Sequence, residues 1–547
     1  MNEPKVQRQC WECKSRRLVC DFARPGCQKC KSRHLDCPGY DGTKPLKWLK
    51  PQQVRYKGRR RDIPVDSRPA TIDSVVRVVP PPTEPDRELT NTLEAFEYYN
   101  LHICPDLAAT GRGGVKSPYF LPLFAASVLP RSLVHSIVCT ALCHRILQSR
   151  DAAPSHQTAL TRKLQRHRGE SLRALSADLG RPEQQTSDRT LASVLSLLLV
   201  EIQHCAASNW RHHSNAAANI IEMTGGLGNL VFSRPYLRPL ARYYAIIEVM
   251  GCTTSPSVSI ESARNQLELI SLLPILYGNG LDSCVPCPPD LFAEIIHINH
   301  LRSRVPNVTT IPSEDKLARL TADKCTVALD ILRRIRAFSP DDWAAAVTLT
   351  NPTTTQQNNT ATASTSNPQT PDFRGWQQIA RIYQSAIAIY CIASLVPDHV
   401  DPNSEASPPG SITPTPQPPP HLTVLTSARQ TCRRILFTYL RKLATPVPQS
   451  TQLRKLVIWP LVVAGIEAGG GGGGGGDRSD GNGTGGDGDE DMRRFVADEL
   501  KWMSAALGIA SPLVAREFLE RRVWERGWEK RRRSWEELFD KSYVFAV

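Results

Sequence analysis

The sequence lacks the features that would indicate a membrane or secreted protein. An apolar stretch at 191–200 ends at Glu201 and is too short to cross a bilayer, so no membrane partner is expected. The first residues, MNEPKVQRQ, contain charges but no apolar segment, and therefore predict no secretory signal. A protein that is not exported stays in a reducing compartment, where cysteines favour metal binding over disulfide bonds.

Patterns typical of an enzyme are also missing, and no enzymatic activity is predicted. No Ser-His-Asp or paired-carboxylate arrangement stands in a context that would make it catalytic. The glycine-rich segment 225–228 follows a predicted helix instead of opening one after a strand, which indicates a loop that ends the helix. The pair Cys284 and Cys287, and the group His204, Cys205, His212 and His213, are interpreted as structural.

Acidic residues are few near the start of the chain. The 547 residues carry a formal net charge of +14, and residues 1–62 alone hold 17 Lys and Arg against 6 Asp and Glu. The remaining residues are therefore almost neutral. This distribution is expected of a nucleic-acid-binding module attached to a neutral body.

A pattern of eleven residues with three cysteines occurs twice within the basic segment. Residues 10–20 are CWECKSRRLVC and residues 27–37 are CQKCKSRHLDC, so both follow C-x-x-C-K-S-R-x-L-x-C. Six cysteines this close could form a disulfide framework or a metal site, and the expected reducing compartment favours the metal site. The predicted ligands are Cys10, Cys13, Cys20, Cys27, Cys30 and Cys37.

Six thiolates can hold two Zn²⁺ ions per chain if two of the cysteines bind both ions. Zinc takes four ligands in a tetrahedron, so two separate ions would need eight. Two bridging sulfurs make six cysteines sufficient. Cys10 and Cys27 open the two repeats at equivalent positions and are the predicted bridging pair. Since so small a segment has no apolar core, the zinc would supply its folding energy.

The spacing C-x2-C-x6-C-x6-C-x2-C-x6-C, with basic residues after the second cysteine and Pro25 in the middle loop, resembles the fungal Zn(II)2Cys6 binuclear-cluster transcription factors. The resemblance implies a small zinc-nucleated domain with two short helices over 6–40, in which the first and fourth cysteines bridge the metals. It also implies contact with a CGG-type triplet at the positions of Arg16 and Arg17, which are commonly lysines in that family. The segments CWEC at 10–13 and KPLKWL at 44–49 are similar to acriflavine-sensitivity regulators.

Basic residues of both repeats are candidate contacts to double-stranded DNA. Arg16 and Arg17 stand at the end of the predicted first helix, where arginine can bind guanine O6 and N7 in the major groove. The second repeat has Asp36 where the first has Val19, and phosphates would repel a carboxylate, so the first repeat is the better candidate for the groove. Four further cations are predicted to contact phosphates, which position the domain without selecting a sequence: Lys14, Lys29, Lys31 and Arg33.

Residues 41–86 are predicted to be a basic, proline-rich linker, because its prolines exclude a long helix. The cations Lys57, Arg59, Arg60 and Arg61 are a candidate nuclear-import signal, a set of phosphate contacts, or both, and a nuclear location is expected. No sustained heptad pattern occurs between 41 and 90. Binding as a monomer and homodimerisation through the large domain are therefore both open.

Residues 87–547 are predicted to form one large all-α domain. Apolar residues recur at helical spacing from Leu89 to Ile103 and over 131–148, a nearly continuous apolar helix covers 190–205, and no alternating strand pattern competes. Three low-complexity insertions, near 349–372, 397–421 and 468–491, contain too few apolar residues to order themselves and are expected to be disordered. Further helices are predicted at 209–223, 235–250, 314–338, 373–396, 422–444, 452–467, 491–508 and 511–526.

The same region resembles the fungal-specific transcription factor domain that often accompanies the cluster. The resemblance rests on short segments in order along the chain: FEYY at 96–99, ICP at 103–105, NWR at 209–211, TGG at 224–226, IWPLVVAG at 458–465 and VW at 523–524. It implies a regulatory domain that contacts the transcription machinery or co-regulators, or that binds a ligand.

Together these observations predict a nuclear, sequence-specific DNA-binding transcription factor of RNA polymerase II genes that recognises CGG-type triplets. Within this class, the alternative is a specific regulator of a secondary-metabolite or drug-resistance gene set. From another class, the body could be a ligand receptor, or the chain could be an interaction scaffold tethered to chromatin. The loss of triplet preference on changing Arg17 distinguishes the DNA reader from the scaffold.

Overall fold

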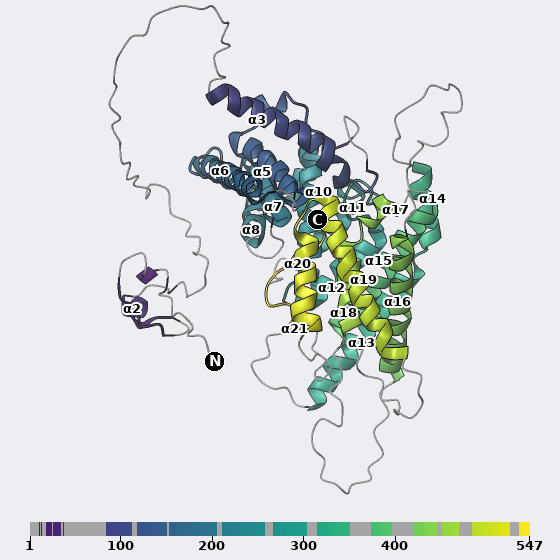
Figure 1. Ribbon diagram of the computed structural model, residues 1–547. Helices are drawn as coiled ribbons and strands as arrows, with labels where there is room; N and C mark the ends of the chain where they lie inside the picture. The colour runs from purple at the N-terminus through teal and green to yellow at the C-terminus, as the bar shows by residue number, and fades with distance from the viewer. Residues whose placement is uncertain are drawn as a thin grey trace, which may run out of the picture. The chain divides into compact units, whose positions relative to one another are not determined.

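The structure is a computed structural model in which the chain divides into two compact units, 1–79 and 80–547 (Figure 1). In the first unit it describes residues 10, 12–13, 18–23, 26–33 and 37. In the second it describes residues 84–111, 117–149, 153–204, 210–256, 266–303, 314–350, 373–396, 420–445, 450–469, 484–525 and 535–546. Each unit is described by itself.

The first unit contains a short helix, α2 (Gln28–Lys31), directly after Cys27. Two groups accept hydrogen bonds at its start: the Cys27 sulfur from the Cys30 backbone N–H at 3.3 Å, and the Asp21 carboxylate from the Gln28 N–H at 3.0 Å. These acceptors satisfy donors that a helix of one turn leaves unpaired. In the first repeat Glu12 and Cys13 are helical, and the residues that would continue this helix lie outside the described part of the chain.

The second unit is built from helices, and its described residues include no strand. Its first half contains α3 (Glu84–Tyr98), α4 (Ala125–Val128), α5 (Arg131–Gln148), α6 (Pro154–Leu179), α7 (Asp188–His204), α8 (Trp210–Met223), α9 (Gly226–Ser233), α10 (Arg238–Thr253), α11 (Leu267–Leu276) and α12 (Pro289–Ser303). The second half contains α13 (Glu314–Ala337), α14 (Pro340–Thr350), α15 (Phe373–Leu395), α16 (Pro420–Ala444), α17 (Ser450–Arg454), α18 (Ile458–Gly469), α19 (Thr484–Leu507), α20 (Ser511–Phe518) and α21 (Trp535–Leu538). Four short segments have other helical geometry: the π-helices η1 (Tyr99–Ile103) and η7 (Leu519–Trp524), and the 3₁₀ helices η2 (Cys104–Leu107) and η4 (Pro235–Leu237).

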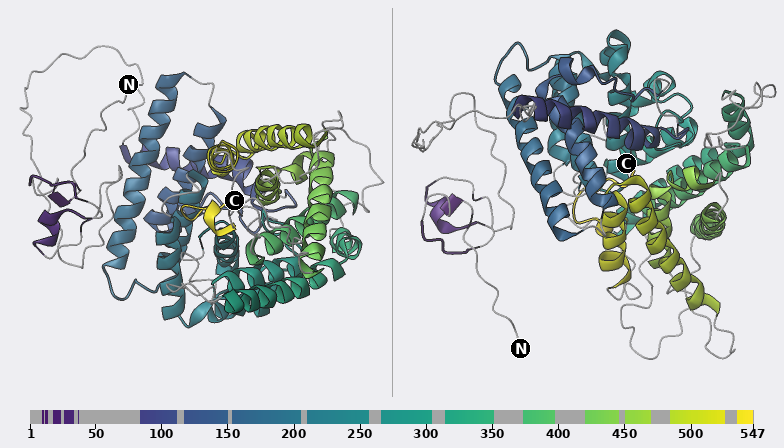
Figure 2. Two further views of the ribbon diagram at one scale, coloured as in Figure 1. Left: turned by 90° about the horizontal axis from the view of Figure 1, so that it is seen from below. Right: turned by 45° about the horizontal axis from the view of Figure 1, so that its top comes forward.

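The helices of the second unit form two neighbouring groups joined by α10 and α12 (Figures 1 and 2). In the first group α5 packs on α3, α6 and α7. In the second group α15 packs on α12, α13, α14, α16 and α18. Contacts of α10 with α7 and with α12 connect the groups, and the largest hydrophobic core extends from the second group into α7. The buried residues of α3 and α5 form smaller clusters of their own.

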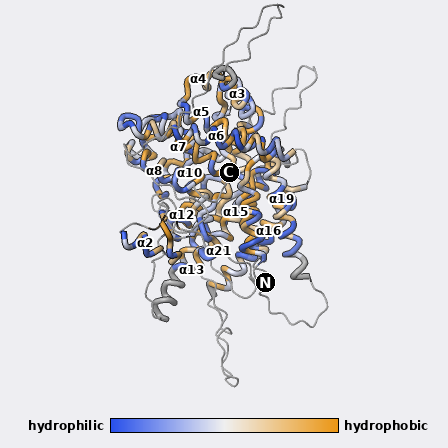
Figure 3. The backbone as a smooth tube through the Cα atoms, turned by 60° about the vertical axis from the view of Figure 1, so that its left-hand side comes forward, coloured by the Kyte–Doolittle hydropathy of each residue, from blue (hydrophilic) through white to orange (hydrophobic). Residues whose placement is uncertain are grey.

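Helices α15 and α18 supply much of the core. All twelve residues of α18 are buried, and the tube along α15 is mainly hydrophobic in Figure 3. The ring of Tyr390 on α15 meets Trp459 on α18 and Trp535 on α21, with centroids 5.9 and 5.2 Å apart. Each large side chain buried in this way contributes roughly 1.5–3 kcal/mol. No helix in the described ranges combines the length and apolarity needed to span a bilayer.

Most predicted helices are present, and α5 has the predicted bounds. The predicted loop at 225–228 is correct only at Gly225, which follows α8 with a φ of 96°. Gly226, Leu227 and Gly228 are helical and open α9, so that part of the prediction is wrong. Two long helices, α6 and α12, were not predicted. Polar side chains such as His167 on α6 and Asn299 on α12 occupy buried positions and interrupt the apolar period.

The boundaries of the predicted linker and insertions differ from the structure. α3 begins at Glu84, inside the predicted linker 41–86, with Pro85 in the first turn, where the missing N–H has no effect. The ends of the predicted insertions are helical: α14 extends to Thr350, α16 starts at Pro420, α18 reaches Gly469 and α19 starts at Thr484. Residues 351–372, 397–419 and 470–483 lie outside the described part.

The acidic tract predicted as part of the third insertion is in fact helical over 484–491. Asp489 forms an ion pair with Arg433, and Asp491 lies 2.5 Å from the Arg441 guanidinium; both arginines are on α16. The opposite face of α19 buries Met492, Val496, Leu500 and Met503 completely. The apolar face and the ion pairs together order a segment whose composition alone predicts disorder.

Candidate metal centre and nucleic-acid interface

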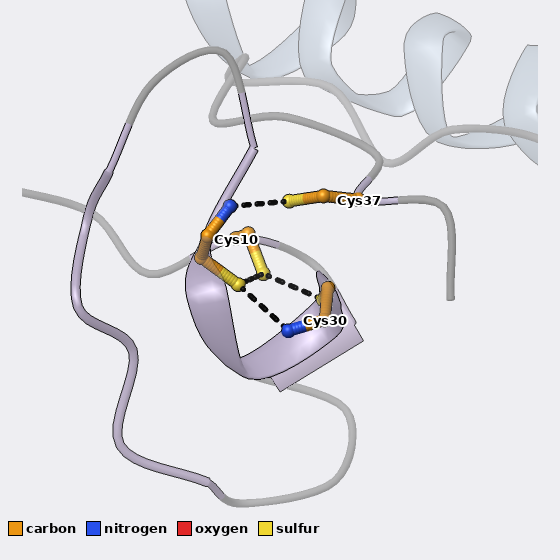
Figure 4. A group of neighbouring side chains, drawn as sticks. Cys10, Cys30 and Cys37 are labelled. Carbon is orange, nitrogen blue, oxygen red and sulfur yellow. Dashed lines mark hydrogen bonds between the residues drawn. The ribbon is translucent and has the colours of Figure 1, made fainter. Parts of the chain in front are cut away.

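The six cysteines predicted as metal ligands converge in the first unit. Their sulfurs form two groups of four, in each of which all sulfurs lie within 4.8 Å of one another. The first group is Cys10, Cys13, Cys20 and Cys27, and the second is Cys10, Cys27, Cys30 and Cys37. The sulfurs of Cys10 and Cys27 thus belong to both groups and lie 3.6 Å apart. Figure 4 shows Cys10, Cys30 and Cys37 pointing toward one another from separate parts of the chain.

The spacing of the sulfurs fits tetrahedral zinc. Four sulfurs at about 2.3 Å from a zinc ion lie about 3.8 Å from one another. The Cys10 sulfur lies 3.8 Å from that of Cys30, and the Cys13 sulfur lies 3.6 Å from that of Cys27. No S–S bond is present, because all six cysteines are free. The geometry is therefore that of two metal sites with a shared edge.

Without a metal ion, the thiols of the cluster are held in the protonated form. Burial, followed by the neighbouring sulfurs of Cys10 and Cys27, raises the pKa of the Cys13 thiol to about 12. Burial, followed by the same two sulfurs, raises the pKa of Cys30 as well. A bound divalent ion stabilises the thiolates and reverses this balance, so metal binding releases protons.

Two residues outside the cysteine pattern shape the cluster, and the sequence analysis did not identify them. Asp21 caps α2 through its carboxylate, with oxygens 3.0 and 3.1 Å from the Gln28 nitrogen. Gly26 lies so close to the second repeat that a Cβ atom there would stand 3.0 Å from the Cβ of Cys37. Nothing in the sequence analysis indicates either the capping by Asp21 or the contact at Gly26.

The candidate DNA contacts of the second repeat lie on α2 or directly after it. Lys29 and Lys31 belong to α2, and Arg33 follows it. All three side chains are exposed, while Cys30 between them is buried in the cluster. The alternation follows from a single helical turn that directs one residue to the metal and its neighbours to solvent.

The other candidate contacts lie outside the described residues. They are Lys14, Arg16 and Arg17 of the first repeat, and Lys57, Arg59, Arg60 and Arg61 of the predicted import signal. Their roles remain predictions.

The two cysteines of the second CxxC motif, Cys284 and Cys287, differ in their surroundings. Cys287 is fully buried and its sulfur contacts the Pro288 carbonyl at 3.6 Å, whereas the half-buried Cys284 donates to the Ala546 carbonyl at 3.6 Å. Burial raises the pKa of the Cys284 thiol to about 11, which leaves it protonated at neutral pH. Among the described residues, neither these cysteines nor His204, His212 and His213 belong to a group of three or more metal-ligand side chains, and Cys205 lies outside those residues.

A thiolate cluster with an exposed cationic surface, joined to a large helical body, defines a zinc-dependent DNA-binding regulator. The sequence model for the fungal Zn(2)-Cys(6) binuclear cluster domain matches residues 8–47, and the model for the fungal specific transcription factor domain matches residues 94–545. The chain therefore belongs to the fungal transcription factors that combine these two domains, and this family is one of regulators and not of enzymes. The expected zinc-nucleated cluster and all-helical body are confirmed.

Two curated proteins are similar to this chain. The cluster-specific transcriptional regulator of phomenoic acid biosynthesis from Leptosphaeria maculans is 27% identical, over all of this chain and 91% of that protein. Arginine metabolism regulation protein II from Saccharomyces cerevisiae is 40% identical over 53 residues, which are 10% of this chain and 6% of that protein. No solved structure matches the chain.

Proposed function

We propose that the protein is a nuclear, sequence-specific transcription factor of RNA polymerase II genes that recognises CGG-type triplets through two zinc ions. The observation that carries the proposal is the membership of the Cys10 and Cys27 sulfurs in both groups of four. Two shared sulfurs are what six cysteines need to complete two tetrahedra. Cys13 and Cys20 would complete the first zinc site, and Cys30 and Cys37 the second.

The cations of the cluster would then have two roles in DNA binding, contact with bases and contact with phosphates. Arg16 and Arg17 would bind guanine edges in the major groove, because a guanidinium matches O6 and N7 of guanine bidentately. Lys14, Lys29, Lys31 and Arg33 would contact phosphates, and Lys29, Lys31 and Arg33 have the exposure that this role requires. The two-zinc core with six thiolates is anionic by itself, so these cations also make its surface attractive to DNA.

The genes controlled by the protein are proposed to be a secondary-metabolite biosynthesis set. The support is the full-length similarity to a regulator of a biosynthetic gene cluster. The cations Lys57, Arg59, Arg60 and Arg61 would serve nuclear import.

The helical body is proposed to form a homodimer or to contact co-regulators. Exposed apolar side chains near α4 support such a surface: Leu123, Phe124 and Val128 are 47%, 69% and 62% exposed. Three large apolar side chains within six residues are typical of a protein contact and not of a solvated loop. Size-exclusion chromatography with light scattering tests the homodimer, which Phe124→Glu would dissociate.

The DNA-binding proposal is tested with the full-length protein loaded with zinc. We expect two zinc ions per chain by mass spectrometry of the metal. We also expect tight binding to a duplex that contains CGG triplets and binding at least tenfold weaker to the same duplex with the triplets scrambled. Equal affinity for both duplexes would show that the protein binds DNA without reading the triplet, and would favour the chromatin-tethered scaffold.

A further inference from the structure

The helical unit contains a cavity of about 390 Å³ that no part of the proposed DNA-binding function uses. Its wall is formed by η1 and η2, by α5 and α7, by the turn between α17 and α18, and by the chain end at Ala546. Most of the lining is apolar, including Leu133, Ile137 and Leu199. The volume falls in the range of sites that hold a small organic molecule.

A few polar side chains in the wall have no hydrogen-bond partner among the described residues. The Gln203 side chain on α7 is 7% exposed, and its amide bonds to no described residue. The hydroxyl groups of Ser196 on α7 and Tyr99 on η1 are likewise unpartnered within the described part of the chain. Gln203 is buried, whereas Ser196 and Tyr99 are half-buried. Because buried polar groups in folded proteins are normally hydrogen-bonded, the unpartnered Gln203 amide indicates a group that a ligand would satisfy.

Other polar groups of the wall already have hydrogen-bond partners, so a ligand does not need to pair with them. Tyr119 donates to the Asp282 carbonyl at 2.5 Å, Tyr383 donates to the Leu456 carbonyl at 2.9 Å, and Thr140 donates to the Ser136 carbonyl at 3.1 Å. The hydrogen-bonding capacity that remains lies on Gln203, Ser196 and Tyr99, together with the Gln452 Nε2 on α17, which is buried and has no hydrogen-bond partner among the described residues.

The charges in the wall cancel. The Lys455 ammonium lies 2.9 Å from both carboxylate oxygens of Asp106, and each side chain is 17% exposed. Burial raises the pKa of the Asp106 carboxyl, and the Lys455 ammonium opposes this effect. Since the pair is internally neutral, a charged ligand would enter without a free counter-ion, and its desolvation would be unfavourable.

The backbone next to Tyr99 is irregular. Tyr99–Ile103 is a π-helix that continues α3 and passes directly into the 3₁₀ helix Cys104–Leu107, and both segments line the cavity. π-Helical turns are uncommon and occur frequently at functional sites. This feature is independent of the unpartnered side chains and points to the same place.

We propose that this cavity binds a neutral, mostly apolar small molecule that carries a hydrogen-bonding oxygen. The apolar wall would hold the body of the molecule, and the Gln203 amide, with Ser196 and Tyr99, would bind the oxygen. The proposal concerns the helical unit and does not depend on how the zinc cluster reads DNA.

The test uses the zinc-loaded full-length protein and Nile red, a neutral apolar dye with a carbonyl oxygen whose fluorescence rises in apolar surroundings. We expect saturable binding of one dye per chain. Ser196→Phe fills the cavity and should weaken binding at least tenfold, and Gln203→Met, which removes the amide at similar volume, should weaken it at least threefold. The matched controls are Ser176→Phe and Gln165→Met at exposed positions of α6, and both should bind as the native protein does.

Circular dichroism and a CGG-duplex titration are run on every variant. Unchanged DNA affinity in all of them separates this proposal from the proposed DNA-binding function. Dye that does not saturate, or dye that binds the folded Ser196→Phe variant with native affinity, overturns the cavity proposal. If Ser196→Phe does not fold, the Nile red affinity of Gln203→Met is the test. Native dye affinity in that variant overturns the proposal.

Discussion

Arg302 and Glu536 form a bidentate ion pair that connects α21, near the end of the chain, to α12 in the core. Arg302 Nε lies 2.7 Å from Oε1 of Glu536, and Nη2 lies 3.1 Å from Oε2. The arginine side chain on α12 is completely buried, and its remaining N–H groups donate to the carbonyls of Cys252 and Ser255 and to the Tyr390 hydroxyl, each at 2.8 Å. α21 is thereby joined to helices that precede it by more than 200 residues in the chain.

Replacing Arg302 by methionine is expected to lower the free energy of unfolding by about 3–5 kcal/mol, since it removes a completely buried cation from its ion pair and takes away the donor of three buried hydrogen bonds. Urea denaturation followed by circular dichroism measures the change. The control is Arg333→Met, which removes an exposed ion pair with Asp330 on α13 and should change stability by less than about 1 kcal/mol. Equal effects of the two substitutions would contradict a structural role for the buried pair.

Changing a bridging cysteine is expected to abolish zinc binding. Cys27→Ser removes one ligand from both proposed sites at once, and because the cluster has no other core, neither site should retain its ion. Zinc content per chain is measured after gel filtration. Cys432→Ser, on α16 in the helical unit, should keep both ions; retention of two ions by Cys27→Ser would refute the shared-sulfur arrangement.

The close approach at Gly26 predicts sensitivity to a single methyl group. Gly26→Ala places a Cβ 3.0 Å from that of Cys37 and should weaken zinc retention by roughly 1–3 kcal/mol through overpacking. Competition with a coloured chelator measures the affinity. Gly488→Ala on α19 meets no atom within 4 Å and should leave zinc affinity unchanged. Identical chelator curves for both variants would disprove the steric argument.

Substitution of phosphate-contacting and base-contacting residues should give different signatures. Lys31→Ala is expected to weaken binding to all duplexes alike and to reduce the slope of log K against log salt by about 0.9. Arg17→Ala is expected to lose roughly 1–3 kcal/mol of preference for the CGG triplet. Lys163→Ala, an exposed lysine of α6, serves as the control. A sequence-dependent loss in Lys31→Ala would reverse the assignment of the two roles.

A buried histidine pair predicts that stability falls in mild acid. The Nδ1 atoms of His135 on α5 and His167 on α6 lie 3.0 Å apart. Burial lowers the pKa of His167 to about 4, with neighbouring His135 and Arg166 acting in the same direction, and burial also lowers the pKa of His135. The unfolded chain therefore takes up protons that the native protein does not, and stability that is complete above pH 6.5 decreases as pH falls toward 4.

The expected slope is at most about 1.4 kcal/mol per pH unit for each histidine. Urea denaturation at several pH values between 4.5 and 7.5 measures it. His167→Gln should flatten the dependence, whereas His156→Gln, at an exposed position of the same helix, should not. If the free energy of unfolding of His167→Gln depends on pH as steeply as that of the native protein, groups other than this histidine pair control stability in acid.

Local information was sufficient to predict that the six cysteines lie together and to predict most of the helices. The cysteine spacing defines the donor set because the ligands come from two short repeats, and no distant residue is needed to complete it. Helix α5 was predicted with its bounds because its apolar period is uninterrupted. The acidic segment before Met492 was interpreted as disordered, since nothing near it in the sequence indicates that Arg433 and Arg441 pair with its carboxylates.

The sequence by itself therefore determined the zinc-binding, DNA-directed character of the first unit and the all-helical character of the second. Both depend on residue spacing over a few helical turns or less. The tertiary structure alone decided that Arg302 meets Glu536, that His135 meets His167, and that Gln203 and Ala546 line the same cavity. These relationships join residues far apart in the chain, and a polar residue gives no sign of which distant partner will make its burial favourable.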